Sequence, residues 1–419
     1  MGTGTLARRL GVRDAVVIGL GSMLGAGVFV VFGPAAAAAG SGPALLLALL
    51  LAGFVAFCNA ISSARLAGRY PESGGTYVYG RERLGDFAGF LAGWGFVIGK
   101  TASCAAAALT IGAYLWPQYA RPVAVAAIVA VTAVNLRGVT RTARATRWLV
   151  TVTLTVLATV AVVGVATGPR ETAALIDPTG TDAGGVLAAA GLLFFAFAGY
   201  ARIATLGEEV RDPSRTIPRA IPLALGLVLL IYAVLAGVAL AVLGRDGLAA
   251  STAPLADVVA TVDVPVLSLL VRVGAAVAVA GVLLSLVAGV GRTTLAMARR
   301  RDLPGALDAV HPRYRVPHRA ESAVAVVVAV VVSIGDIRHA IGFSSVTVLV
   351  YYAIANASAL TLGREPGRRL PVQALAVLGL VGCLLLAVTL PGASVLAGFG
   401  VLGVGALWYA VRRGLRRAG

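Results

Sequence analysis

The sequence contains few of the side chains from which proteins build disulfide frameworks and metal sites. Of its 419 residues, only three are cysteine and three are histidine. Cys58, Cys104 and Cys383 lie in apolar stretches without metal-ligand spacing, so we interpret them as small buried hydrophobes. His311 and His318 share one polar stretch and form no metal-ligand pattern. We therefore expect neither a metal nor a cofactor.

Acidic residues are also scarce, with 18 Asp and Glu against 35 Lys and Arg. None lies between Asp14 and Glu72, which bears on the glycine-rich stretch Gly19–Gly25. That stretch superficially resembles a dinucleotide-binding pattern, but it lacks the acid that would bind the ribose hydroxyls. No strand-length run precedes it either. A dinucleotide-binding domain is therefore excluded.

The chain is rich in apolar residues. Hydrophobic residues make up 59% of it, charged residues 13%, and the mean hydropathy is +0.91. This composition predicts an all-α integral membrane protein, with room for about 12 transmembrane helices of ~20 to 25 residues. We expect helices at about 12–39, 43–66, 86–115, 121–138, 146–167, from 184, 217–243, 265–298, 320–335, 340–362, 371–390 and 394–411. No small-residue cleavage site follows the first span, which argues against a removed signal peptide.

The basic residues are unevenly distributed between alternate connections. Most fall in one set, at Arg8, Arg9 and Arg13, and within 65–83, 137–147, 211–219, 299–319, 364–369 and 412–417. Only Arg121, Arg170, Arg245 and Arg338 fall in the other set. By the positive-inside rule, the first set and both termini are cytoplasmic. The net charge of +17 therefore indicates membrane orientation and gives no reason to expect a nucleic acid partner.

Four glycines, Gly19, Gly21, Gly25 and Gly27, interrupt the first apolar span near its middle. Glycine lowers helix stability by roughly 1 kcal/mol relative to alanine, so this cluster predicts a break. Broken backbone in a membrane has to be buried in protein or line a cavity, and in transporters it forms the binding site. The alternative is an unbroken helix whose glycines let a neighbouring helix pack closely.

A second interrupted span is expected from 184 onward, where Gly199 follows a short apolar run and Arg202 begins a polar stretch. Paired interruptions at matching places in two halves point to a transport site. On this hypothesis one half is 12–167 and the other is 184–362. The segment 370–412 then lies outside the repeat.

Several motifs resemble those of one known family. They are Gly25–Phe29, Pro71–Tyr77, Phe194–Tyr200, Gly207–Pro218, and Ala296–Arg299 with Asp302–Pro304. In order and spacing they resemble the amino acid permeases of the amino acid–polyamine–organocation superfamily. The resemblance implies a single permease domain over 1–419, with a LeuT-type five-plus-five inverted repeat, discontinuous helices 1 and 6, and alternating access.

The resemblance also implies a substrate site, formed by Met23, Gly25, Ala26, Gly27, Phe195, Ala196, Ala198 and Gly199. The substrate carboxylate would accept hydrogen bonds from the backbone N–H groups of Ala26 and Gly27. Its ammonium would face the carbonyls of Met23, Phe195 and Ala198. The Phe195 ring would close over the substrate.

Lys100 is the only lysine in the chain and the only charge near the middle of the span at 86–115. A lysine at the bilayer centre costs roughly 2.5 to 3.5 kcal/mol, so it should face protein or water. We expect it to link protonation to transport and to disfavour cationic substrates; the alternative is a structural lysine. Ala201 stands where cationic amino acid transporters of this superfamily often have an acid, and Thr153 stands where some members have a lysine.

The sequence thus predicts a bacterial plasma-membrane transporter that takes up neutral amino acids with protons. Alternatives within the class are an amino acid/polyamine exchanger and a cationic amino acid transporter. A membrane enzyme would need a clustered nucleophile, acid–base pair or metal site, and a channel would need rings of pore-lining charge. The sequence pattern offers neither. Expected partners are the amino acid, protons and membrane lipid.

Overall fold

The structure is a computed structural model that describes residues 11–70, 74–138, 143–168, 171–200, 203, 210–363 and 371–418. Within these ranges the chain is helical and contains no β-sheet. Among the described residues, ten helices are long and apolar enough to cross a membrane. The predicted all-helical membrane protein is therefore confirmed.

The helices follow the expected order along the chain. The first half contains α1 (Val12–Met23), α2 (Ala26–Val30), α3 (Phe32–Ala39), α4 (Gly42–Arg69), α5 (Thr76–Leu84), α6 (Asp86–Leu115), η1 (Pro117–Tyr119), α7 (Ala120–Leu136), α8 (Ala143–Ala166) and α9 (Ala173–Ile176). The remainder contains α10 (Ala183–Phe197), η2 (Ala198–Tyr200), α12 (Pro213–Ala250), α13 (Pro254–Ala260), α14 (Pro265–Arg299), η3 (Gly305–Asp308), α15 (His318–Ile334), α16 (Ile337–Leu360), α17 (Pro371–Thr389) and α18 (Gly392–Ala418).

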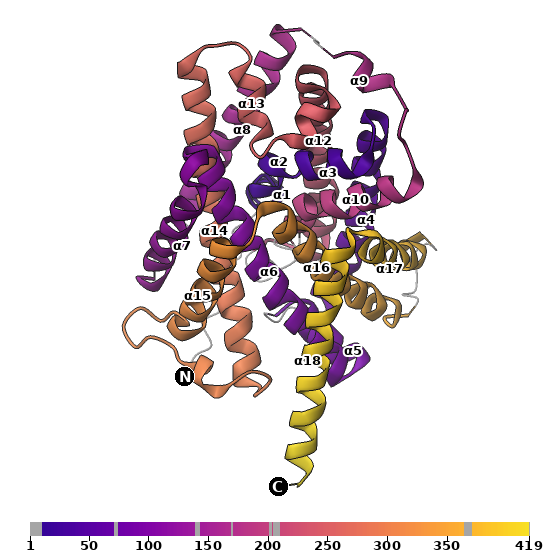
Figure 1. Ribbon diagram of the computed structural model, residues 1–419. Coiled ribbons are helices and arrows are strands. Elements are labelled where there is room, and N and C mark those ends of the chain that lie inside the picture. The colour runs from indigo at the N-terminus through magenta and orange to yellow at the C-terminus, as the bar shows by residue number, and fades with distance from the viewer. Residues whose placement is uncertain are drawn as a thin grey trace.

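The long helices run between two ends of the molecule (Figure 1). The short helices α9 and α13 lie at the upper end, whereas α5 and the end of α18 lie at the lower end. Helix α6 is central: it packs against α14 and α16, and also against α2. The first, broken span is thereby enclosed by other helices, as unpaired backbone groups in a membrane require.

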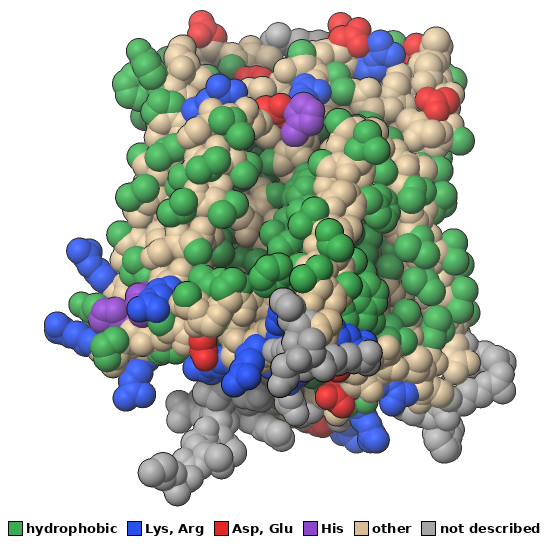
Figure 2. Space-filling model, turned by 60° about the horizontal axis from the view of Figure 1, so that its bottom comes forward, with side chains coloured by type: hydrophobic (Ala, Val, Ile, Leu, Met, Phe, Trp, Pro, Cys, Tyr) green, Lys and Arg blue, Asp and Glu red, His purple; other side chains and the backbone are tan. Residues whose placement is uncertain are grey.

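The surface matches a membrane environment. Figure 2 shows hydrophobic side chains over the middle of the visible face, with charged side chains gathered at its two rims. Large apolar residues such as Val162, Val266 and Ile334 are about three-quarters exposed, at 67%, 72% and 78%. Lys and Arg dominate the lower rim and acids are more frequent at the upper rim. This distribution agrees with the charge asymmetry in the sequence.

Most predicted boundaries lie within a few residues of the observed helices, but the connection after the second span differs. Its first residues, Pro71, Glu72 and Ser73, lie outside the described residues, and helix α5 begins at Thr76. Gly74 and Gly75 adopt positive φ values of 135° and 56°, and so form the turn that precedes α5. The sequence pattern did not predict this helix.

Helix α5 is fixed by a buried polar network. The Tyr77 hydroxyl donates to Asp302 Oδ2 at 2.7 Å, and Arg81 forms an ion pair with the same oxygen at 2.6 Å. Burial raises the pKa of the Tyr77 phenol, and the hydrogen bond to Asp302 raises it further. Tyr77 therefore remains a donor at neutral pH. The network joins α5 to the segment between α14 and η3.

Candidate substrate site

The first apolar span is broken where the glycines predicted it. Helix α1 ends at Met23 and α2 begins at Ala26, with Gly25 at φ −120° and ψ −143° between them. Helical hydrogen bonding continues from α2 into α3, because the Val31 N–H donates to the Gly27 carbonyl at 2.9 Å. The first N–H groups of this half-helix have no partner within the helix. They are positioned, with the positive end of the helix dipole, to receive an anionic group.

The second predicted interruption begins at the end of α10. The α-helix stops at Phe197 and continues as the 3-10 turn η2, over Ala198–Tyr200. Phe195 and Gly199 are partly exposed, while the other residues of 191–200 are buried. Arg202 and the acids Glu208 and Glu209, expected just beyond, lie outside the described residues. The second half of the predicted break is therefore not described.

The two interruptions contact each other through glycine. A Cβ added to Gly199 would lie 2.2 Å from the Ser22 carbonyl oxygen, at the end of α1. A Cβ added to Gly27 would lie 2.5 Å from Cα of Ala196 on α10. Neither position can hold a side chain without movement of backbone. The glycines of both spans thus let the two broken segments approach within backbone contact.

Tyr232 on α12 bridges the two broken segments. Its hydroxyl donates to the carbonyl of Met23 at 2.7 Å and to that of Ala196 at 3.1 Å. Its ring packs against Phe197 and Phe32, with centroid distances of 5.2 and 6.2 Å. The single hydroxyl proton is therefore shared between two carbonyls, one from each interrupted span.

A second tyrosine, Tyr352 of α16, donates to the second interrupted segment alone. The Tyr352 hydroxyl donates to the Ala198 carbonyl at 3.2 Å. Its ring lies 5.1 Å from that of Tyr200 and 5.8 Å from that of Phe194. Tyr232 and Tyr352 were not predicted from the sequence, because both are apolar-span tyrosines whose partners are far away along the chain.

Of the predicted site residues, the structure brings Met23 and Gly27 of the first break into contact range of Ala196 and Gly199 of the second. Met23, Gly25, Ala26 and Gly27 come from the first break, and Phe195, Ala196, Ala198 and Gly199 come from the second. Two of the three carbonyls expected to face the ammonium, those of Met23 and Ala198, accept hydrogen bonds from tyrosine hydroxyls. Both carbonyls are therefore hydrogen-bonded to side chains of the protein in this structure.

The comparison with known proteins identifies the family. The sequence matches the amino acid permease family over residues 10–411. The chain belongs to the amino acid permeases. It is 61% identical to an uncharacterized transporter of Mycobacterium tuberculosis, over 98% of this chain and 93% of that protein.

More distant relatives of the permease differ in the solutes that their names give. A methylthioribose transporter of Bacillus subtilis is 26% identical, over 84% of this chain and 81% of the relative. A branched-chain amino acid permease of the same species is 27% identical, over 76% of this chain and 73% of the relative. These names, with the family match, describe a transporter and not an enzyme.

Lys100 lies at the middle of α6, partly exposed among buried neighbours. In the described part of the permease it has no hydrogen bond or ion pair. The neighbouring Gly99 contacts Thr347 on α16, because a Cβ there would lie 2.2 Å from Thr347 Oγ1. Thr153 of α8 donates its hydroxyl to the Leu149 carbonyl of its own helix at 2.8 Å.

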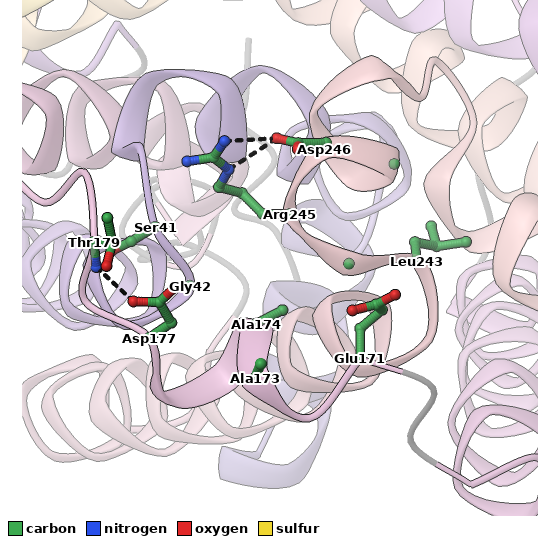
Figure 3. A pocket seen from close by; sticks show the side chains of 12 residues that line it. Ser41, Gly42, Glu171, Ala173, Ala174, Asp177, Thr179, Leu243, Arg245 and Asp246 are labelled. Carbon is green, nitrogen blue, oxygen red and sulfur yellow. Dashed lines mark hydrogen bonds and ion pairs between the residues drawn. The ribbon is translucent and has the colours of Figure 1, made fainter.

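A pocket of about 470 Å³ lies elsewhere, at the upper end of the permease (Figure 3). Glu171, Asp177, Arg245 and Asp246 line it, with Ser41 and other residues. Arg245 is held by Asp246 at 2.8 Å, and hydrogen bonds from Thr179 lower the pKa of Asp177. None of the predicted site residues lines this pocket, so it is distinct from the junction of the broken helices.

Proposed function

We propose that this permease is a secondary active transporter that takes up neutral amino acids together with protons. One observation carries the proposal: two interrupted membrane helices meet at their interruptions, and a single hydroxyl, that of Tyr232, bridges their carbonyls. Discontinuous helices that meet near mid-membrane are how many transporters build a solute site.

The proposed binding mode uses both helix ends. The N–H groups of Ala26 and Gly27 bind the carboxylate, since the start of α2 offers unpaired donors and a positive dipole end. The ammonium binds the carbonyl of Phe195 and competes with the tyrosine hydroxyls for the carbonyls of Met23 and Ala198. The partly exposed Phe195 ring covers the substrate.

Alternating access follows from this arrangement. We propose twelve spans, with 12–167 and 184–362 as inverted repeats and 370–412 outside them. The junction closes when the Tyr232 and Tyr352 hydroxyls form their hydrogen bonds to the backbone carbonyls. It opens when α1 moves away from η2. Substrate that replaces these hydrogen bonds binds the two states differently, and only such a difference can shift their populations.

Uptake by purified protein in liposomes tests the proposed function. Radiolabelled leucine, alanine, serine and arginine, and the polyamine putrescine, are offered with and without an inward proton gradient. Accumulation of a neutral amino acid that rises with the gradient supports the proposal. Uptake that occurs only against an internal amino acid or polyamine would instead support an exchanger, and uptake of none of these solutes would reject the proposal.

Lys100→Met is expected to increase competition by arginine against uptake of the neutral substrate. We propose that the Lys100 ammonium repels cationic solutes on their path, because it lies within the protein with no paired acid in the described residues. The measurement is the arginine concentration that halves uptake, which should fall several-fold in the variant. An unchanged value would make Lys100 a structural lysine.

We propose a bacterial plasma-membrane location with both termini cytoplasmic. Single cysteines in 137–147 and 299–319 should resist an impermeant thiol reagent on intact cells, whereas those in 168–183 and 245–263 should react. The reason is the arginine excess in the first two segments. The native Cys58, Cys104 and Cys383 are all buried, so they give little background. Labelling of 299–319 from outside would contradict this topology.

A further inference from the structure

Glu321 is a carboxyl buried where no function has been assigned. It lies in the first turn of α15 and is only 2% exposed. Its Oε2 atom is buried without a hydrogen-bond partner. The sequence pattern did not single it out, because it stands beside His318 and Arg319 at the edge of a polar stretch. An unpaired carboxylate in such surroundings is strongly disfavoured relative to the neutral acid.

A glycine on the facing helix makes room for this carboxyl. A Cβ added to Gly291 of α14 would lie 2.5 Å from Glu321 Cγ and 3.5 Å from Oε1. Gly289, two residues earlier on the same helix, has no heavy atom within 4 Å of its added Cβ. The close approach is therefore specific to Gly291. It places the carboxyl directly against the α14 backbone.

Two more buried polar atoms without partners lie near the same interface. They are Nδ1 of His318 and Oγ1 of Thr294. His318 precedes Glu321 by three residues on α15, so the two side chains share one face. Thr294 follows Gly291 by three residues on α14, toward the same end of the molecule. Together with Glu321 these groups form a polar cluster that leads from the buried carboxyl toward the lower end.

The charges around this cluster leave the carboxyl without a counter-ion. Arg292 of α14 is the residue whose charge acts on Glu321, but among the described residues the two form no ion pair. On η3, Asp308 is bonded to Arg299 at 3.0 Å. On α7, which packs against α15, the described cation nearest this end is Arg137, at the C-terminus of the helix.

Lys100 of α6 lies at a height along the bundle similar to that of Gly291 on α14, and α6 packs against both α14 and α15. Gly93 contacts Met297, and Arg272 donates to the Tyr114 carbonyl, so α6 and α14 run antiparallel in this register. Counting residues along both helices from these two contacts places Lys100 at about the same height along the helix bundle as Gly291. It forms no ion pair with Glu321 in the described structure.

We propose that Glu321 is a proton-binding site of the permease, at which the carboxylate takes up one proton and later releases it to cytoplasmic water. This proposal rests on the transport function proposed above and names the group that carries the coupling ion. A Cβ on Gly25 at the broken helix would lie 2.7 Å from Val282 of α14. Gly291 is about 14 Å further along that helix, at 1.5 Å per residue. The proton site is thus separate from the substrate junction and nearer the lower end.

Glu321→Gln tests the proposal because glutamine keeps the size of the side chain but cannot titrate. The full-length protein in liposomes is assayed with the most strongly transported neutral amino acid of the uptake screen. For one proton per substrate, an inward gradient of about one pH unit supports about tenfold accumulation. We expect that accumulation to fall to about onefold in the variant, while exchange of internal for external amino acid continues.

Matched variants keep this test decisive. Glu321→Asp retains a titratable acid, so it should retain accumulation. This variant keeps the proposal testable if the glutamine variant folds poorly. Gly291→Ala should displace the carboxyl and lose accumulation, whereas Gly289→Ala should not. If the Glu321→Gln variant still accumulates substrate, the proposal is overturned. If only the Lys100→Met variant loses accumulation, Lys100 and not Glu321 is the proton site. If the unaltered protein exchanges amino acid but does not respond to the proton gradient, the Glu321 proposal fails while the proposed amino acid transport is supported. If it neither exchanges nor accumulates amino acid, both proposals fail.

Discussion

Replacement of Tyr232 by phenylalanine is expected to lower thermal stability and to raise substrate affinity, because the ammonium no longer competes with this hydroxyl for the Met23 carbonyl. The phenylalanine ring can keep the contacts with Phe32 and Phe197, so the variant removes only the hydroxyl. The carbonyls of Met23 and Ala196 then lose their shared donor inside the membrane. The Met23 carbonyl still accepts from the N–H of Gly25 at 2.9 Å, so the Ala196 carbonyl bears the loss. An unsatisfied buried polar group costs roughly 1 to 3 kcal/mol, which is about 5- to 150-fold in an equilibrium constant.

The measurement is initial uptake in liposomes over a range of substrate concentrations, with a melting curve in detergent. Tyr119→Phe serves as the control, because Tyr119 is 56% exposed and lies in the short turn η1. We expect the control to match the unaltered protein in both assays. A Tyr232→Phe variant with unchanged affinity and unchanged melting would contradict the bridging role of the hydroxyl.

Local sequence was sufficient to predict the break in the first span. Four glycines within nine residues weaken any helix, and the observed break at Leu24 and Gly25 lies inside that cluster. The apolar spans were equally predictable: the segment expected at 86–115 is the observed α6. Both predictions depend on properties of consecutive residues, which a single sequence displays directly.

The groups that complete the site could not be predicted in this way. Tyr232 and Met23 are separated by 209 residues in the sequence, and nothing near either residue indicates the other. Glu321 is similar, since its burial depends on Gly291 of another helix. Helix α5 was missed for a local reason: its start follows Gly74 and Gly75, whose turn signal outweighed the short helical pattern behind it.

The need to satisfy backbone carbonyls inside the membrane explains the tyrosines at the junction. A transport site needs broken backbone, but carbonyls freed by the break have no water to bond within the membrane. Tyr232 and Tyr352 supply donors from α12 and α16, neither of which is broken at that point. In the proposed binding mode, the substrate ammonium replaces these donors. The hydroxyls therefore stabilise the junction without substrate and leave the carbonyls available to it.

Gly27→Leu is expected to abolish substrate binding, and Gly27→Ala to weaken it strongly. In the proposed binding mode a side chain here fills the space of the carboxylate, and in the structure it also strikes α10. An added Cβ would lie 2.5 Å from Cα and 2.6 Å from Cβ of Ala196. Overpacking of this kind typically costs about 1 to 3 kcal/mol, and more where only backbone can move.

Variants at three positions separate this effect from general damage to the protein. Gly237→Ala on α12 adds the same methyl where no heavy atom lies within 4 Å, so its binding should be unchanged. Ala196→Gly combined with Gly27→Ala removes the contact at 2.6 Å but leaves that with Cα at 2.5 Å. We therefore expect at most partial recovery of affinity in a purified binding assay. Normal binding by Gly27→Leu, with insertion confirmed, would mean that α2 and α10 do not meet at the substrate site.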